Sequence, residues 1–100
     1  MPFSPIPEIL DELREGKPIV LVDDEDRENE GDIVYAAEKV TPEAVNFMLK
    51  EARGLICVSL TSKDCERLRL HPQTHINTAQ LGTAFTVTVD AHPRFGQSWR

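Results

Sequence analysis

The first 22 residues combine a helical pattern of apolar side chains with a short, continuous apolar run. Ser4 is expected to cap a helix, with Pro5 at its first position, and Gly16 to end it in a left-handed conformation. The β-branched run at 19–22 predicts a strand that is buried on both faces. Spacings of three and four residues predict one buried helical stripe from four side chains: Ile6, Ile9, Leu10 and Leu13.

The rest of the chain continues with alternating strand and helix patterns. A cap residue followed by proline, or by an acidic residue three positions later, marks each helix start. Five further elements are expected: a strand at 33–37, a helix opened by Thr41 and Pro42 and ended by Gly54, a strand at 55–60, a short helix from Thr61 to about Leu70, and a strand at 84–91.

The order of these elements predicts an α+β fold with a mixed parallel and antiparallel sheet flanked by helices. The first two strands are joined by a short loop, so they can pair antiparallel. The later strands are reached through helices, so they can be parallel. A length of 100 residues allows one domain.

Composition favours a soluble protein of the cytoplasm. Apolar residues make up 40% and charged residues 28% of the chain, and no apolar run approaches the roughly 20 residues of a membrane-spanning helix. The acidic start does not resemble a secretory signal. Cys57 and Cys65 are too few for a disulfide framework, and their spacing of eight is not typical of metal ligands. They are expected to be buried, reduced thiols.

The charge of the chain is concentrated in one short segment. The net charge is −6, and the segment 23–32, with the sequence DDEDRENEGD, holds seven acidic residues and one arginine. Acidic and basic residues balance in the remainder of the chain. A nucleic acid would be repelled by this segment, and no basic stripe offers it another surface, so no nucleic-acid partner is expected.

The acidic segment has three possible interpretations. It could be a solvated loop, as charge runs usually are. It could be a calcium loop, because Asp26, Glu28, Glu30 and Gly31 match the first half of an EF-hand, although Ala37 stands where the bidentate glutamate belongs.

The third interpretation is a catalytic metal and acid–base site. In an extended segment Glu28, Glu30 and Asp32 would share one face, while Arg27 would face the other way. Carboxylate oxygens of this kind suit Mg²⁺ or Mn²⁺. Neighbouring carboxylates can also act as base and acid at different pKa values.

Three segments together resemble one enzyme family. DDEDRENEGD follows IVLV, RGLICVSL comes some twenty residues later, and TAFTVTVDA lies beyond it. The chain is therefore similar to 3,4-dihydroxy-2-butanone 4-phosphate synthase. The resemblance implies a lyase of riboflavin biosynthesis that converts D-ribulose 5-phosphate to formate and L-3,4-dihydroxy-2-butanone 4-phosphate. It also implies a requirement for Mg²⁺ or Mn²⁺, a cytoplasmic location and a homodimer.

The resemblance assigns roles to individual residues. Glu28 matches the glutamate that binds the metal and contacts the substrate. Glu30 and Asp32 match catalytic carboxylates. The resemblance implies a substrate-binding set made up of Arg27, Glu28, Asp32, Cys57 and Thr83.

The resemblance extends to Gly96, so residues 1–96 are expected to be the N-terminal part of a synthase domain. Residues 97–100 do not match. A threonine-rich turn, an arginine–glycine–histidine segment and a later glutamate, which complete the family's site, are absent. The isolated chain is therefore expected to be an inactive fragment. The alternative is a non-enzymatic half-domain that binds divalent metal or a protein partner.

Overall fold

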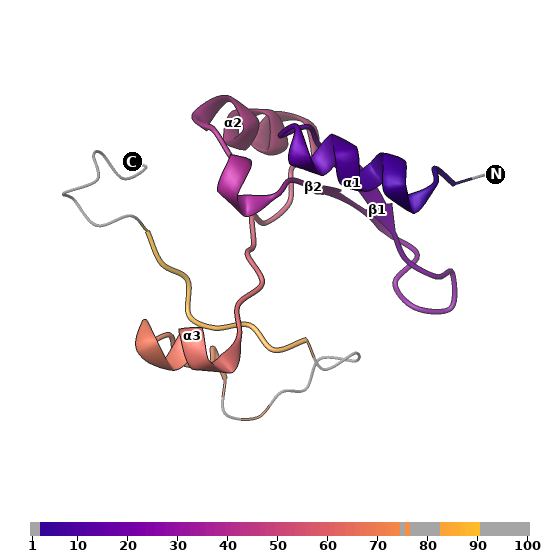
Figure 1. The fold of residues 1–100 in the computed structure, drawn as a ribbon. Helices are drawn as coiled ribbons and strands as arrows, with labels where there is room; N and C mark the ends of the chain where they lie inside the picture. Colours follow the sequence, from indigo (N-terminus) through magenta and orange to yellow (C-terminus); the bar gives the residue numbers. More distant parts are fainter. Residues whose placement is uncertain (1–2, 75, 77–82, 91–100) are drawn as a thin grey trace. The chain divides into compact units, whose positions relative to one another are not determined.

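The computed structural model describes residues 3–74, 76 and 83–90, in two units that divide after Val58 (Figure 1). Each unit is described by itself. The first contains α1 (Ile6–Arg14), β1 (Ile19–Val22), β2 (Gly31–Val34), the 3₁₀ helix η1 (Ala37–Lys39) and α2 (Pro42–Glu51). The second contains α3 (Ser62–Arg67).

Helix α1 begins one residue later than expected and ends as expected. Pro5 is extended, with φ −62° and ψ 142°, and is itself the N-cap, so the predicted cap by Ser4 is wrong. At the other end Gly16 has φ +80°. The Gly16 amide donates to the Leu13 carbonyl and the Lys17 amide donates to the Glu12 carbonyl, at 3.1 and 3.0 Å. This pair of hydrogen bonds is a Schellman cap, which needs a residue in the left-handed conformation.

Strands β1 and β2 form an antiparallel hairpin beside α1, as the short connection predicts (Figure 1). The pairing runs from Ile19 with Val34 to Val22 with Gly31. The second strand thus starts at Gly31 and stops at Val34, two residues before the predicted start and three before the predicted end. The chain turns into η1 at Ala37 instead.

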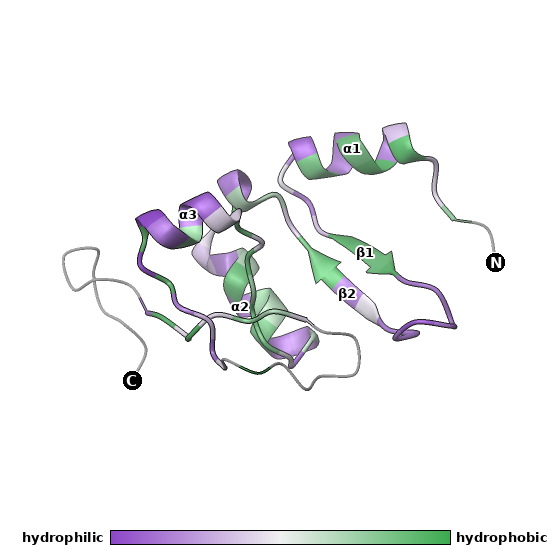
Figure 2. Cartoon of the chain, turned by 90° about the horizontal axis from the view of Figure 1, so that it is seen from below, coloured by the Kyte–Doolittle hydropathy of each residue, from purple (hydrophilic) through white to green (hydrophobic). Residues whose placement is uncertain are grey.

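The prediction that β1 is buried on both faces is wrong. Val20, Leu21 and Val22 expose 70%, 57% and 47% of their surface. Burial on both faces requires strands on either side and a cover above and below, and the described sheet has only two strands. Figure 2 shows the hydrophobic β1 leading into a hydrophilic loop.

Helix α2 has the predicted start but a different end. The Thr41 hydroxyl accepts a hydrogen bond from the Ala44 amide at 3.1 Å, a cap of the kind that contributes about 1 kcal/mol. Ala44 is the one hydrophobic residue that is buried among the described residues. The helix ends at Glu51, and Arg53, with φ 57°, takes the left-handed position. The prediction that Gly54 ends this helix is therefore wrong.

Helix α3 repeats this arrangement in the second unit. The Thr61 hydroxyl accepts from the Asp64 amide at 3.1 Å, as the cap pattern predicts. The helix stops at Arg67, and Arg69 is left-handed with φ 57°. The Leu70 amide then donates to the Cys65 carbonyl at 2.8 Å.

Two predicted strands do not form in the described part of the chain. Residues 55–60 carry no strand, and residues 84–90 make only an isolated bridge between Pro72 and Thr86. Ala91, the predicted end of the last strand, lies outside the described residues. A strand pattern produces a ladder only where a neighbouring strand is aligned with it. The α+β class holds, but the sheet described is antiparallel, without the predicted parallel part. In the described residues no helix is both long enough and apolar enough to span a bilayer.

Candidate functional site

The acidic loop, defined here as residues 23–30, closes the β1–β2 hairpin. The Asp23 amide donates to the Glu30 carbonyl at 3.3 Å, just beyond the last strand pair. Residues 25–28 form a turn, in which the Asp24 carbonyl accepts from the Arg27 amide at 3.0 Å. Asn29 is left-handed, with φ 52°, a conformation that asparagine tolerates better than most residues. The loop projects from the end of the hairpin (Figure 1).

One carboxylate organises this loop from within. The Asp23 Oδ2 atom accepts hydrogen bonds from the Glu28 amide at 3.1 Å and from the Arg27 Nη1 atom at 2.9 Å. Its Oδ1 atom accepts from the Glu30 amide at 3.0 Å. The Asp23 side chain is 25% exposed, less than the 54% of its ion-pair partner Arg27. The two strand ends and the turn are thus tied to a single side chain.

Arg27 bridges two acidic side chains. Its Nη1 atom lies 2.9 Å from Asp23 Oδ2 and 2.9 Å from Glu28 Oε1. The hydrogen bond to Asp23 and the charge of Glu28 raise the pKa of the Arg27 guanidinium above its usual value. Arg27 therefore stays cationic and offsets part of the mutual repulsion within the loop.

The loop is expected to loosen only under strongly acidic conditions. The hydrogen bond from the Glu30 amide lowers the pKa of Asp23 below its ordinary value of 3.8, helped by the Glu28 amide and Arg27. A lowered folded-state pKa stabilises the folded loop above the unfolded-state pKa, and this is lost as the pH falls through the folded value. The amide chemical shifts of Glu28 and Glu30, followed by NMR from about pH 6 to about pH 2, should have a midpoint below 3.8. A midpoint at or above 3.8 would contradict the role of these hydrogen bonds, and the Lys50 amide in α2 serves as control.

The structure does not place the acidic side chains on one extended face. The turn at 25–28 and the left-handed Asn29 interrupt the alternation on which that prediction depended. Arg27 was expected to face away from Glu28, but the two side chains form an ion pair. This correction changes the immediate surroundings of Glu28, because one of its oxygens already has a cationic partner.

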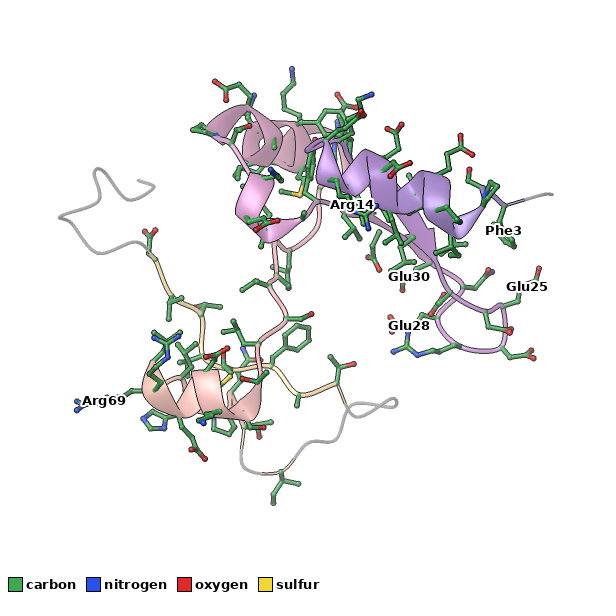
Figure 3. The ribbon with its side chains drawn as sticks, viewed as in Figure 1. Phe3, Arg14, Glu25, Glu28, Glu30 and Arg69 are labelled. Atoms are coloured by element: carbon green, nitrogen blue, oxygen red, sulfur yellow. The ribbon has the colours of Figure 1, made fainter. Side chains whose placement is uncertain are left out.

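Glu30 and Asp32 lie on the side of the loop that joins β2. The backbone of Glu30 is held by Asp23 through both its amide and its carbonyl, while its carboxylate forms no hydrogen bond or ion pair with any described residue. Asp32 stands opposite Leu21 in the hairpin and is exposed. Figure 3 shows Glu28 and Glu30 on the same loop. Both catalytic candidates therefore have carboxylates accessible to a ligand.

The remaining two candidates are not brought to the loop by the described contacts. Cys57 lies in the extended segment 55–60 and is exposed, and Cys65 is half-buried, so the prediction of two buried thiols is wrong. Both cysteines are free, as expected. Thr83 is exposed and belongs to the second unit. The structure thus assembles Arg27, Glu28, Glu30 and Asp32 on one hairpin, and leaves the roles of Cys57 and Thr83 as predictions.

The carboxylates of the loop fit a magnesium site that is completed by other groups. In the part of the chain that the structure describes, no three histidine, cysteine or acidic side chains are grouped to hold a metal. Mg²⁺, however, is usually held by one or two carboxylates, with water and substrate oxygens filling the other positions. Glu28 has one oxygen paired with Arg27 and a second available, and its side chain is 36% exposed. Glu28 therefore offers one carboxylate ligand for such a site.

Asp23 is the residue whose importance the sequence did not indicate. Seven acidic residues in one segment look equivalent, and only the folded loop distinguishes the one that accepts three hydrogen bonds. One local signal was available. Aspartate at the start of a turn commonly accepts hydrogen bonds from nearby amides, and Asp23 is the first acidic residue after the apolar run at 19–22.

Comparison with protein families identifies the acidic loop as part of a longer match. Residues 7–98 match the model of the family described as 3,4-dihydroxy-2-butanone 4-phosphate synthase. A riboflavin biosynthesis protein RibBA of Aquifex aeolicus is 58% identical over 94% of this chain. A 3,4-dihydroxy-2-butanone 4-phosphate synthase of Neisseria meningitidis serogroup B is 53% identical over 89% of it. The chain covers 23% and 24% of these two relatives, about a quarter of their length.

Solved structures give the same relationship. A crystal structure of 3,4-dihydroxy-2-butanone 4-phosphate synthase in complex with two magnesium ions superposes with a TM-score of 0.85 at 42% identity, over 91% of this chain and 43% of that one. A two-domain synthase, RibBX from A. baumannii, superposes with a TM-score of 0.78 at 44% identity, over 91% of this chain and 26% of that one. Both similarities include the hairpin and its loop within the covered length.

Proposed function

Because the chain belongs to the 3,4-dihydroxy-2-butanone 4-phosphate synthase family, we propose that it supplies the metal- and substrate-binding loop of a riboflavin-pathway lyase. The reaction converts D-ribulose 5-phosphate to formate and L-3,4-dihydroxy-2-butanone 4-phosphate. The observation that carries this proposal is the β1–β2 hairpin, whose acidic loop carries Arg27, Glu28 and Glu30 and whose strand β2 carries Asp32, all within the matched residues 7–98.

The residues of the loop suit the steps that such a reaction needs. Glu28 would hold Mg²⁺ or Mn²⁺, which supplies electrostatic stabilisation of charge that develops on substrate oxygens. Glu30, with an accessible carboxylate on a fixed backbone, is placed to accept a proton from a carbon next to the substrate carbonyl. Protonated in that step, Glu30 would give the proton to a departing hydroxyl, which leaves as water, and Asp32 would hold the substrate through its hydroxyl groups. Arg27 would bind an anionic or hydroxyl oxygen of the substrate.

To bind the substrate, Arg27 must turn some of its N–H donors away from the acidic side chains of the loop. Its Nη1 atom contacts Asp23 and Glu28 at the same distance of 2.9 Å. A cation on Glu28 would weaken the pull of that carboxylate on the guanidinium. The guanidinium has five N–H donors, so it could remain bonded to Asp23 while turning others to the substrate. Metal and sugar phosphate are therefore expected to bind more tightly together than separately.

The binding half of this proposal is tested with the chain itself. In the presence of Mg²⁺, D-ribulose 5-phosphate is expected to shift the NMR amide signals of residues 27–32, and to do so much less without the metal. Inorganic phosphate is the control, because it shares only the anionic group. The absence of any shift in these residues at saturating metal would contradict a substrate-binding loop.

Catalysis by the purified chain is expected to be absent or nearly so. The structure groups no three metal-ligating side chains in the residues it describes, and the chain covers only about a quarter of the length of the curated relatives that it matches. Formate release from D-ribulose 5-phosphate, followed by proton NMR, should therefore not exceed the release measured with Mn²⁺ in the absence of the chain. Formate production above that level would show that these 100 residues suffice.

A second candidate function is a non-enzymatic half-domain that binds metal or a full-length synthase. The exposure of Val20, Leu55 and Val89, at 70%, 84% and 71%, favours an interaction partner for this chain. A pull-down against a full-length synthase distinguishes the two functions. A complex of defined stoichiometry that releases formate no faster than the full-length synthase alone would favour the half-domain. A complex that releases formate faster than the synthase alone would favour the lyase.

A further inference from the structure

One side chain of the acidic loop contacts three of the residues that are proposed to bind the metal and the substrate. Asp23 accepts hydrogen bonds from the Glu28 amide, the Glu30 amide and the Arg27 guanidinium, at 3.1, 3.0 and 2.9 Å. These three partners are the residues proposed to hold the metal, move a proton and bind the substrate. Each other carboxylate of the described loop has at most one hydrogen-bond or ion-pair partner: Asp24 accepts from the Asp26 amide, and Glu28 pairs with Arg27.

The contacts fix the backbone at the two functionally important positions. An amide bonded to a carboxylate gives a charge-assisted hydrogen bond, which is shorter and stronger than a neutral one. The Glu28 and Glu30 amides are both held in this way by the two oxygens of one carboxylate. The backbone at Glu28 and at Glu30 is therefore tied to one side chain.

Asp23 also competes with Glu28 for Arg27. Both carboxylates lie 2.9 Å from the same Nη1 atom. Without the Asp23 carboxylate, the guanidinium would be paired with Glu28 alone. Asp23 thus shares Arg27 with Glu28 as well as holding the Glu28 backbone.

We propose that Asp23 is a positioning residue, which presents Glu28 and Glu30 to the divalent metal and shares Arg27 with Glu28. This inference rests on the proposed function, because it assumes that Glu28 binds metal. It assigns Asp23 no direct contact with the metal or with the substrate. Outer partners of this kind typically contribute 10- to 100-fold to metal affinity.

The test compares two isosteric substitutions in the same loop. Asp23→Asn and Asp26→Asn each remove one negative charge, but the Asp26 side chain forms no hydrogen bond or ion pair with any described residue. Mn²⁺ binding to the 100-residue chain is measured from the electron paramagnetic resonance signal of the unbound ion. Asp23→Asn is expected to weaken binding about tenfold, and Asp26→Asn no more than a few-fold. Circular dichroism checks that the helices persist in both variants.

A measurement on the unsubstituted chain keeps the inference testable if a variant fails to fold. The Glu28 and Glu30 amides are expected to exchange with solvent more slowly than the Glu25 amide, which no described group accepts. Equal exchange rates would overturn the positioning role.

The outcomes also separate this inference from the function on which it rests. Equal Mn²⁺ affinities for Asp23→Asn and Asp26→Asn, with normal binding by the unsubstituted chain, would overturn the role of Asp23 and leave the metal site intact. A chain that binds no Mn²⁺ at all would overturn both.

Discussion

Replacing Glu28 by glutamine is expected to reduce the affinity of the chain for Mn²⁺ by about a hundredfold, more than any other single substitution in the acidic loop. The amide keeps the shape of the side chain but supplies a neutral oxygen in place of a charged one. Mg²⁺ and Mn²⁺ prefer carboxylate oxygens as ligands. Among the described residues, no group of three metal-ligating side chains is present that could compensate for the loss of Glu28. The Arg27 ion pair would also be lost, which leaves the guanidinium bonded to Asp23 alone.

The matched control is Glu25→Gln. Glu25 lies in the turn of the same loop and makes no side-chain hydrogen bond or ion pair with the described residues (Figure 3). Both substitutions remove one unit of charge, so a general attraction of cations to the loop would weaken equally in both. A specific ligand role predicts a large loss only for Glu28. Similar affinities for the two variants would reject Glu28 as the metal ligand and support a solvated acidic loop.

The purified chain is expected to associate with itself through the apolar side chains of β1. Val20 and Val22 are 70% and 47% exposed, and a two-stranded hairpin presents unpaired backbone groups at its edges. Exposed apolar strands of this kind promote pairing between molecules. Light scattering at increasing concentration should therefore give a mass above the 11.3 kDa of one chain.

Val20→Lys is expected to shift this equilibrium toward single chains. Removing one valine from a buried contact costs about 1.5 kcal/mol, or roughly tenfold in the association constant. A lysine on an edge strand also repels a second copy. Asn46→Lys in α2 adds the same charge at an exposed polar position and serves as the control. If both variants associate as strongly as the unsubstituted chain, β1 is not the contact surface.

The elements that the sequence predicted correctly depend on contacts between near neighbours. Thr41 and Thr61 each cap a helix through an amide three residues away, and Gly16 ends α1 through bonds that span a few residues. The antiparallel hairpin likewise follows from a short connection between two apolar runs. Such features require only local geometry, so pattern and spacing are sufficient to predict them.

The elements that the sequence did not predict depend on partners elsewhere in the chain or on a choice between equivalent residues. The strand pattern at 55–60 has no aligned neighbour in the described structure, and that at 84–90 pairs only through the isolated bridge between Pro72 and Thr86. Arg53 instead of Gly54 ends α2, because the position of the last helical turn decides which residue must be left-handed. The residue roles at the site came from the resemblance to a family, whereas the selection of Asp23 among seven acids came from the fold.

The closure of the acidic loop also bears on how the chain folds. Every hydrogen bond that shapes the loop joins residues no more than seven positions apart, and the strands that carry it pair directly with one another. The entropy of closing so short a loop is small, and isolated hairpins form in about 1–10 μs. The geometry of residues 23–30 should therefore be established in the earliest folding events, before contacts between distant segments are made.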